Sequence, residues 1–234
     1  MYKRQDGRPL KLNNYTMSSV KYKIMRDGMV ITEGELKQKE PSVAIIDLDQ
    51  HFGNGTSHIF YHRSDVLYTS IHAHPKYCYP FSGYPSEIGI KEGAGYTINV
   101  PLLPGTETID WLHALNFVNK IVREFSPEII LVSIGFDGLK DDPVGMLNLS
   151  LEAFHGAAYL ISELARDTCK GKITAVLEGG YYLQRLSKCA ELFIRGLLNE
   201  RPEILNTLSK IPPSKHATAL INQTKKAIKE KWRI

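Results

Sequence analysis

Short runs of apolar residues alternate with stretches of helical periodicity along most of this chain. The apolar runs predict five strands: "VAIIDLD" (43–49), "VLYTSIH" (66–72), "YTINVPL" (96–102), "EIILVSIGFD" (128–137) and "ITAVLEGG" (173–180). Most of these runs are hydrophobic at nearly every position, as expected for strands that are covered on both faces. Strands that alternate with helices favour βαβ units and a parallel sheet.

Helices are predicted between and after these strands. Ser150 is a suitable N-cap for a helix over 151–169 that ends near Gly171, and further helices are predicted over about 185–199 and from Lys215. Another helix is predicted between the third and fourth strands by apolar residues at helical spacing, namely Trp111, Leu115, Val118, Val122 and Phe125.

The length of 234 residues suits one large α/β domain. We assign residues 42–234 to this domain and expect 213–234 to be a basic helical tail. Residues 1–41 have mixed polarity and no clear period, so we interpret them as an irregular lead-in or as the remnant of a missing N-terminal part.

Composition and charge exclude few functions. The chain is 43% hydrophobic and its net charge is +4, much of which comes from the C-terminal "KKAIKEKWR". Such a run is usually a solvated helix face, so nucleic-acid binding is not favoured. No apolar run is long enough to cross a bilayer, and no apolar leader segment is visible. Three separate cysteines, Cys78, Cys169 and Cys189, indicate a reducing compartment, and we expect the cytoplasm.

Two of the predicted strands end in polar side chains. Asp47, Asp49 and His51 occupy alternate positions at the end of the first strand, and alternate positions of a strand share one face. Asp137 follows the fourth strand, and parallel strands end at the same edge of a sheet, where ligands bind. Two charged strand ends at one edge are costly unless a cation lies between them. The pattern therefore predicts a metal site.

The type of ligand narrows the choice of metal. Two carboxylates and an imidazole, with one position open for water, suit a catalytic zinc ion. The same set suits Fe(II), Co(II) or Mn(II). In the alternative interpretation, these aspartates only cap turns and helices, which is common for a single Asp at a strand end.

Five motifs follow one another in order: "DLDQHFGNGT", "SIHAHPKYCYPFSG", "INVPLLPGT", "GFDGLKDDPVG" and "LEGGYY". Together they resemble the zinc-dependent histone deacetylase superfamily, especially its class II and acetylpolyamine amidohydrolase branch. The resemblance runs from about residue 43 to residue 199. It implies the arginase–deacetylase fold, a parallel sheet with helices on both faces. It also implies hydrolysis of an N-acetyl amide, of acetyl-lysine or an acetylpolyamine, to acetate and a free amine.

The resemblance also implies roles for single residues. Asp49, His51 and Asp137 would be the zinc ligands, and Tyr181 would donate a hydrogen bond to the substrate carbonyl. Tyr79 would form an aromatic wall of the substrate tunnel. Without the resemblance, Tyr181 would be read as a surface turn residue and Tyr79 as a half-buried aromatic.

Further residues match positions behind the metal. Asp47 corresponds to a carboxylate that the family uses, together with Ser70, for a monovalent cation such as K⁺. Asn54 stands where some members carry Asp, and Phe52 where many carry a second His that is not a ligand.

The same family uses a tandem His pair upstream of this strand as general base and acid, but no histidine precedes His51 here. The chain is therefore interpreted either as N-terminally incomplete or as a degenerate relative. General acid–base catalysis contributes about 10²–10⁴ in rate, so we expect a weak or inactive deacetylase. We also expect an uncovered sheet edge with exposed apolar surface and poor solubility. His72 and His74 are assigned no function.

Two other functions stay open. A ureohydrolase with two manganese ions would need a D-x-H-x-D strand end, whereas this chain has D-x-D-x-H. A non-catalytic metal-binding pseudoenzyme that binds acetylated ligands would explain the absent histidines. The sequence does not determine the oligomeric state and is compatible with a homo-oligomer.

Overall fold

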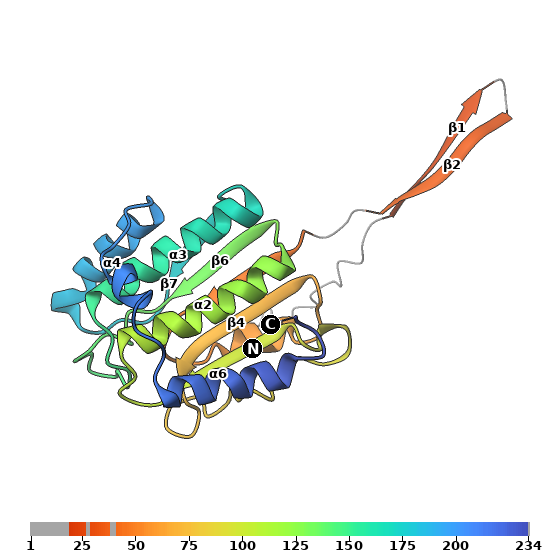
Figure 1. Ribbon diagram of the computed structural model, residues 1–234. Coiled ribbons are helices and arrows are strands. Elements are labelled where there is room, and N and C mark those ends of the chain that lie inside the picture. Colours follow the sequence, from red (N-terminus) through yellow and green to blue (C-terminus); the bar gives the residue numbers. More distant parts are fainter. Residues whose placement is uncertain (1–18, 27–28, 38–40, 234) are drawn as a thin grey trace, which may run out of the picture. The chain divides into compact units, whose positions relative to one another are not determined.

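The structure, a computed structural model, describes residues 19–26, 29–37 and 41–233 (Figure 1). The chain divides into two units, Met1–Glu40 and Pro41–Ile234. In the first unit, β1 (Ser19–Arg26) pairs antiparallel with β2 (Met29–Lys37). Sequence analysis assigned no strand to this part of the proposed lead-in, and residues 1–18 lie outside the described residues.

The second unit is built on a five-stranded sheet whose order is β5-β4-β3-β6-β7. All neighbouring strands are parallel. The five strands lie within the predicted apolar runs or extend one residue beyond them, so the predicted parallel sheet is confirmed. They are β3 (Val43–Asp47), β4 (Val66–Ala73), β5 (Thr97–Leu102), β6 (Ile129–Ile134) and β7 (Ile173–Leu177).

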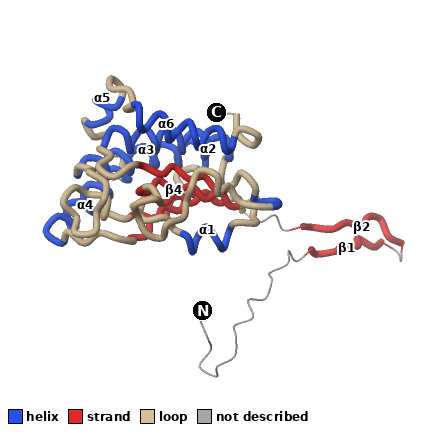
Figure 2. The backbone as a smooth tube through the Cα atoms, turned by 90° about the horizontal axis from the view of Figure 1, so that it is seen from below, coloured by secondary structure: helices blue, strands red, loops and turns tan. Residues whose placement is uncertain are grey.

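Helices lie on both faces of this sheet, as predicted. Figure 2 shows α2, α3 and α6 along one face and α1 on the opposite face. The helices of the described residues are α1 (Asn54–Phe60), α2 (Thr108–Phe125), α3 (Leu151–Cys169), α4 (Leu183–Leu197), α5 (Ile204–Leu208) and α6 (Lys215–Ile228), with a 3₁₀ turn, η1 (Lys91–Gly93). None of them combines the length and the apolarity that crossing a membrane requires.

Helix ends follow local chemistry. The α2 and α3 helices end in left-handed residues, Ser126 at φ 54° and Lys170 at φ 56°, whose N–H groups bond back to the last turn. Gly171 follows Lys170, as predicted from the sequence. Ser214 is the N-cap of α6, and its side chain accepts a hydrogen bond from the N–H of Ala217.

The two faces of the sheet bury hydrophobic clusters of different size. The main cluster packs the side chains of Ile46, Ile130 and Val132 under α2 and α3, where Trp111 and Phe154 are fully buried. On the opposite face, the buried cluster formed by the described residues is smaller and consists of Ile45, Phe52, Val66 and Tyr68. The polar strand ends open toward this less covered face, because Asp47 continues the alternation of Val43 and Ile45.

Candidate metal centre

Three predicted ligands meet at the carboxyl edge of the sheet. Asp49 and His51 follow β3, and Asp137 follows β6, its direct neighbour. One ligand atom from each lies within 4.8 Å of the others. The Nδ1 atom of His51 is 2.8 Å from Oδ2 of Asp137 and 3.1 Å from Oδ1 of Asp49. The two strand ends therefore bring together the set that the sequence predicted.

Two glycines make room for the carboxylates. A Cβ atom on Gly135 would overlap the carboxylates of Asp49 and Asp137, and a Cβ atom on Gly179 would lie 2.6 Å from Oδ2 of Asp137. Any larger residue at either position would displace the carboxylates. This cradle was not predicted, because a glycine in a sequence does not reveal what its backbone approaches.

Backbone N–H groups orient the two carboxylates. Gly179 donates to Oδ2 of Asp49 at 2.9 Å, and Gln50 donates to Oδ1 of Asp137 at 3.1 Å. The other oxygen of Asp137, Oδ2, is buried and faces His51 Nδ1 without making a hydrogen bond of good geometry. A buried carboxylate oxygen without a hydrogen bond is costly. This orphaned oxygen, like the choice of donors, fits a divalent cation.

The pKa shifts of the three residues are also consistent with a divalent cation between them. The nearby carboxylates of Asp137 and then of Asp49 raise the pKa of His51 to about 12, although burial opposes the shift. Burial raises the pKa of Asp137. The pKa of Asp49 is lowered because hydrogen bonds from His51 and Gly179 outweigh the effect of burial. Without a metal ion, a protonated imidazole supplies the positive charge between the carboxylates, which a divalent cation would replace.

Asp47 lies one row deeper, on the same face of the sheet. Its carboxylate accepts a hydrogen bond from the hydroxyl of Tyr68 at 2.7 Å, and burial raises its pKa to about 7. Its register partners are Ser70 on β4 and Ser133 on β6. This arrangement is compatible with the predicted role behind the metal. Tyr68 was missed, since an apolar strand gives no sign of which tyrosine reaches a carboxylate.

A cavity of about 450 Å³ opens beside the two ligands that follow β3. It is lined by Asp47, Asp49, His51, Phe52, Gly53, Thr56, Ser133, Leu177, Glu178, Gly179 and Tyr181. Its position at the metal centre makes it the candidate substrate site. Tyr181, predicted to contact the substrate, belongs to its wall and is 54% exposed.

Besides Asp137 and Ser70, which are described above, the predicted residues Asn54 and Tyr79 also lie outside this cavity lining. Asn54 is exposed at the start of α1. Tyr79 is 66% exposed and contacts Phe81 edge to face, with ring centroids 6.4 Å apart. Their proposed roles stay predictions.

Asp142 and Gln50 support the site and were not predicted. The Oδ2 atom of Asp142 accepts hydrogen bonds from the N–H groups of Tyr181 and Tyr182 at 2.7 and 2.9 Å, and so holds the turn that carries Tyr181. The Gln50 amide donates to the carbonyl of Val144 and accepts from the N–H of Met146, both at 2.7 Å. An available signal was the Asp-Pro step in "KDDPVG", since Asp before Pro favours a turn that the side chain stabilises.

His72 is a structural residue. It is fully buried, with Nδ1 2.8 Å from the Ser70 hydroxyl and Nε2 2.9 Å from the carbonyl of Gly83. Because a carbonyl only accepts, Nε2 carries the proton and Nδ1 accepts from Ser70. Burial lowers the pKa of His72 to about 4.

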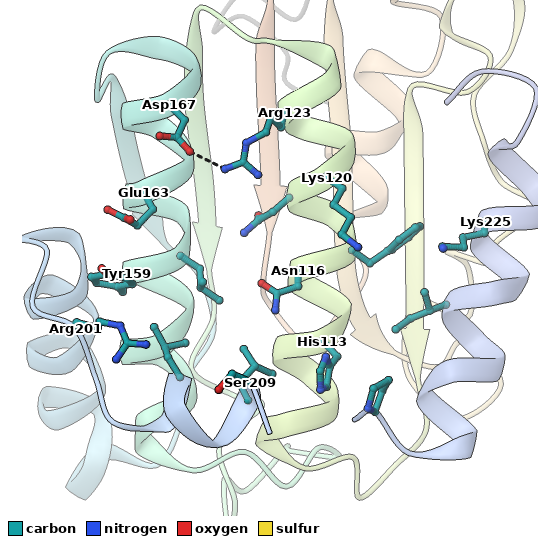
Figure 3. Close-up of a pocket in the computed structure, with 17 residues that line it drawn as sticks. His113, Asn116, Lys120, Arg123, Tyr159, Glu163, Asp167, Arg201, Ser209 and Lys225 are labelled. Carbon is teal, nitrogen blue, oxygen red and sulfur yellow. Dashed lines mark hydrogen bonds and ion pairs between the residues drawn. The ribbon is translucent and has the colours of Figure 1, made fainter. Parts of the chain in front are cut away.

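A larger cavity, of about 720 Å³, lies on the helical side of the molecule between α2, α3, α5 and α6 (Figure 3). Arg123 and Asp167 form an ion pair of 2.7 Å across it. Within the described residues, the only cluster able to hold a metal ion is Asp49, His51 and Asp137, so the larger cavity is not the candidate active site.

Comparisons with known proteins agree with this geometry. Residues 27–197 match the model of the histone deacetylase domain. The chain is 39% identical over 150 residues to a protein named Probable deacetylase from Archaeoglobus fulgidus, covering 64% of this chain and 41% of that protein. It is 34% identical over 176 residues to Acetylpolyamine amidohydrolase 2 from Pseudomonas aeruginosa, covering 75% of this chain and 50% of that protein.

Solved structures extend the likeness to the fold. The crystal structure of the HDA15 HD domain superposes with a TM-score of 0.73 at 32% identity, covering 82% of this chain and 51% of that one. The chain thus spans about half the length of the relatives it matches, or less.

Proposed function

Because this chain belongs to the histone deacetylase domain family, we propose that it acts as a zinc-dependent deacetylase. The reaction is hydrolysis of an N-acetyl amide, of acetyl-lysine or an acetylpolyamine, to acetate and a free amine. The observation that carries the proposal is the convergence of Asp49, His51 and Asp137 beside an open cavity.

The three ligands would hold zinc, and Fe(II) or Co(II) would fit the same donors. When bound, such an ion supplies Lewis acidity toward the amide carbonyl and toward the attacking water. Asp49 and Asp137 are already oriented by backbone N–H groups, so binding requires little rearrangement of either carboxylate. Asp47, with Ser70 beside it and Asn54 as a further candidate, would tune the site or hold K⁺.

Tyr181 is the proposed oxyanion donor. Its backbone is fixed by Asp142, while its side chain stays exposed at the cavity wall. From the cavity wall, its hydroxyl would donate to the carbonyl oxygen of a bound substrate. Loss of such a donor costs about 10²–10³ in rate. Tyr79 is proposed as an outer aromatic contact of the substrate.

The general base is the part of the proposed mechanism that the residues of the site support least. Among the described residues lining the cavity, His51 is the only histidine, and the proposed chemistry uses it as a ligand. This favours slow turnover by the chain alone, and it supports a second candidate function, a non-catalytic protein that binds acetylated ligands. The three unpaired cysteines are compatible with the cytoplasm as the proposed compartment.

The test separates metal binding from turnover. Purified chain is loaded with Zn²⁺, metal per chain is measured, and acetate release is followed with an acetylated lysine peptide and an N-acetylated diamine. We expect one zinc ion per chain and slow acetate release, which Tyr181→Phe lowers about 10²–10³-fold and the neighbouring control Tyr182→Phe does not.

Three outcomes would contradict the proposal. Two metal ions per chain would favour a ureohydrolase-like centre. Zinc binding with ligand affinity but no acetate release would favour the non-catalytic function. A chain that binds no zinc would remove the basis of both.

A further inference from the structure

A buried carboxylate joins two loops beside the candidate metal centre. Asp142 follows the predicted ligand Asp137 by a few residues and is 7% exposed. Its Oδ2 atom accepts hydrogen bonds from the N–H groups of Tyr181 and Tyr182. Hydrogen bonds from backbone N–H groups to a carboxylate are stronger than those between neutral groups. The backbone of Tyr181 is therefore fixed to the loop that begins at a metal ligand.

One consequence of this contact concerns stability. Tyr182 is the N-cap residue of α4, and its own side chain makes no capping hydrogen bond to a described residue. Negative charge at the N-terminus of a helix is favourable, because the first N–H groups lack partners within the helix. The carboxylate of Asp142 therefore also stabilises the start of α4, and a role in function needs a separate argument.

That argument begins with the turn formed by residues 142–146, which we call the 142–146 turn. The N–H of Val144 donates to Oδ1 of Asp142, and the N–H of Gly145 donates to the carbonyl of Asp142, both at 3.0 Å. A Cβ atom on Gly145 would lie 2.8 Å from the carbonyl oxygen of Asp137. The turn therefore packs directly against the backbone of a predicted ligand.

Gln50 ties the same turn to the end of β3. It lies between the two predicted ligands that follow this strand, and it is 1% exposed. Its N–H donates to Oδ1 of Asp137 at 3.1 Å. Its side chain holds the turn through two bonds of 2.7 Å, to the carbonyl of Val144 and from the N–H of Met146. One buried residue thus contacts both a ligand carboxylate and the turn that carries Asp142.

We propose that Gln50 and Asp142 are positioning residues that set the distance between the Tyr181 hydroxyl and the metal. Gln50 fixes the 142–146 turn to the strand end that carries the ligands, and Asp142 fixes Tyr181 to that turn. Neither residue belongs to the described lining of the cavity, so both act through Tyr181. The inference rests on the proposed function, in which Tyr181 donates to the substrate carbonyl.

The first experiment measures the position of Tyr181 without turnover. The chain is loaded with Co²⁺, which the same donors accept, and 3-fluorotyrosine replaces Tyr181 alone. Paramagnetic relaxation of the fluorine nucleus falls with the sixth power of its distance from Co²⁺. A displacement of about 1 Å, enough to affect catalysis, therefore changes the relaxation rate about twofold.

Asp142→Asn and Gln50→Met should each lower this relaxation rate about twofold, because a released turn can move away from the metal while the ligands block its approach. Asp141→Asn is the matched control for charge, since Asp141 is exposed and Asn tolerates its φ of 66°. Gln223→Met, at an exposed position of α6, is the matched control for Gln50. Both controls should leave the rate unchanged.

The second experiment is a double-mutant cycle with Tyr181→Phe, followed by acetate release from the zinc-loaded chain. Asp142→Asn should lower kcat about 10²-fold with little change in KM. In the Tyr181→Phe background it should lower kcat no further, because the hydroxyl that Asp142 positions is already absent. Zinc affinity should change less than about threefold. Gln50→Met leaves Asp142 in place and tests the same coupling if Asp142→Asn does not fold.

The outcomes separate this inference from the proposed function. A Co²⁺-loaded chain whose fluorine relaxation is the same in both variants as in the wild type overturns the inference and leaves the proposed function intact. Equal losses of kcat with and without the Tyr181 hydroxyl would show that Asp142 only stabilises the fold. If the chain binds Co²⁺ but releases no acetate, the proposed function fails while the relaxation measurement still decides the inference. A chain that binds no Co²⁺ overturns both.

Discussion

Two histidines stand near the ends of neighbouring strands and have opposite properties. His51, after β3, is partly exposed and lies between the carboxylates of Asp49 and Asp137, which raise its pKa to about 12. His72, near the end of β4, is fully buried, and its pKa falls to about 4. Carboxylates thus favour positive charge at one strand end, whereas burial favours the neutral form of the same side chain at the next.

The two histidines differ in pKa because different groups surround their rings. Carboxylates around His51 stabilise positive charge, whether a proton or a metal ion supplies it. A hydroxyl and a carbonyl around His72 satisfy both ring nitrogens of the neutral form, and burial penalises the charged form. Gly83, at φ 99°, lets its carbonyl approach the ring, since a Cβ atom there would overlap His72 and Phe52. One histidine is therefore expected to bind metal and the other to hold the core together.

The largest effect is expected for His51→Ala, which tests whether His51 is a metal ligand. We expect the zinc affinity to fall about 10³-fold, because one of three protein ligands is lost. The free energy of unfolding of the metal-free chain should change little by comparison. Competition with a chromophoric chelator measures the affinity, and His58→Ala, an exposed histidine on α1, is the matched control. Unchanged zinc binding by His51→Ala would show that the ligand set is wrong.

The reverse result is expected for His72→Ala. Removing the ring leaves a cavity and strands the Ser70 hydroxyl and the Gly83 carbonyl, which should cost about 3 kcal/mol of unfolding free energy. Chemical denaturation at neutral pH measures the loss. Zinc stoichiometry should stay at one per chain. A variant as stable as the wild type but unable to bind zinc would assign His72 to the metal centre instead.

The pH dependence of stability tests whether burial keeps His72 neutral. The folded pKa of His72, about 4, lies below its ordinary value of 6.5, so the unfolded state binds this proton first as the pH falls. The stabilisation is complete above pH 6.5 and is lost toward pH 4. Between about pH 7.5 and about pH 5 the loss should be about 2 kcal/mol.

Asp47 complicates that measurement and must be separated from it. Its folded pKa is raised to about 7, so it makes the fold more stable as the pH falls through the same range. The difference in unfolding free energy between the wild type and His72→Ala cancels the contribution of Asp47. That difference should shrink as the pH is lowered. If it stays constant, His72 is not held neutral by burial.

The two histidines also show which features of the fold and the site could be predicted from the sequence. The apolar runs predicted all five strands of the sheet, and the alternation of Asp47, Asp49 and His51 placed those side chains on one face. The rule that parallel strands end at one edge brought Asp137 to them. These features follow from local periodicity and from chain direction, which a sequence carries.

The parts that could not be predicted depend on contacts between distant residues. Nothing near Gly179 in the sequence indicates that it cradles carboxylates from β3 and β6, and nothing near Asp142 indicates that it holds the turn of Tyr181. The alternation with Asp47 and Asp49 marked His51 as a candidate ligand, but no pattern near His72 indicated which partners its ring nitrogens would meet. Partners and burial, which separate them, are properties of the folded chain.

The smallest expected effect is that of Tyr68→Phe, which tests a carboxylate whose side-chain partner is neutral. Asp47 is buried and accepts a hydrogen bond from the Tyr68 hydroxyl, in contrast to Asp49 and Asp137, which face His51. Removing the hydroxyl should lower the unfolding free energy by about 1 kcal/mol at pH 8. The loss should be smaller at pH 5, where Asp47 is protonated in the folded state and needs the donor less. Zinc affinity should change less than about threefold, because Tyr68 touches no ligand atom. Denaturation at both pH values and chelator competition measure these effects, and a large loss of zinc affinity would mean that Asp47 itself is a ligand.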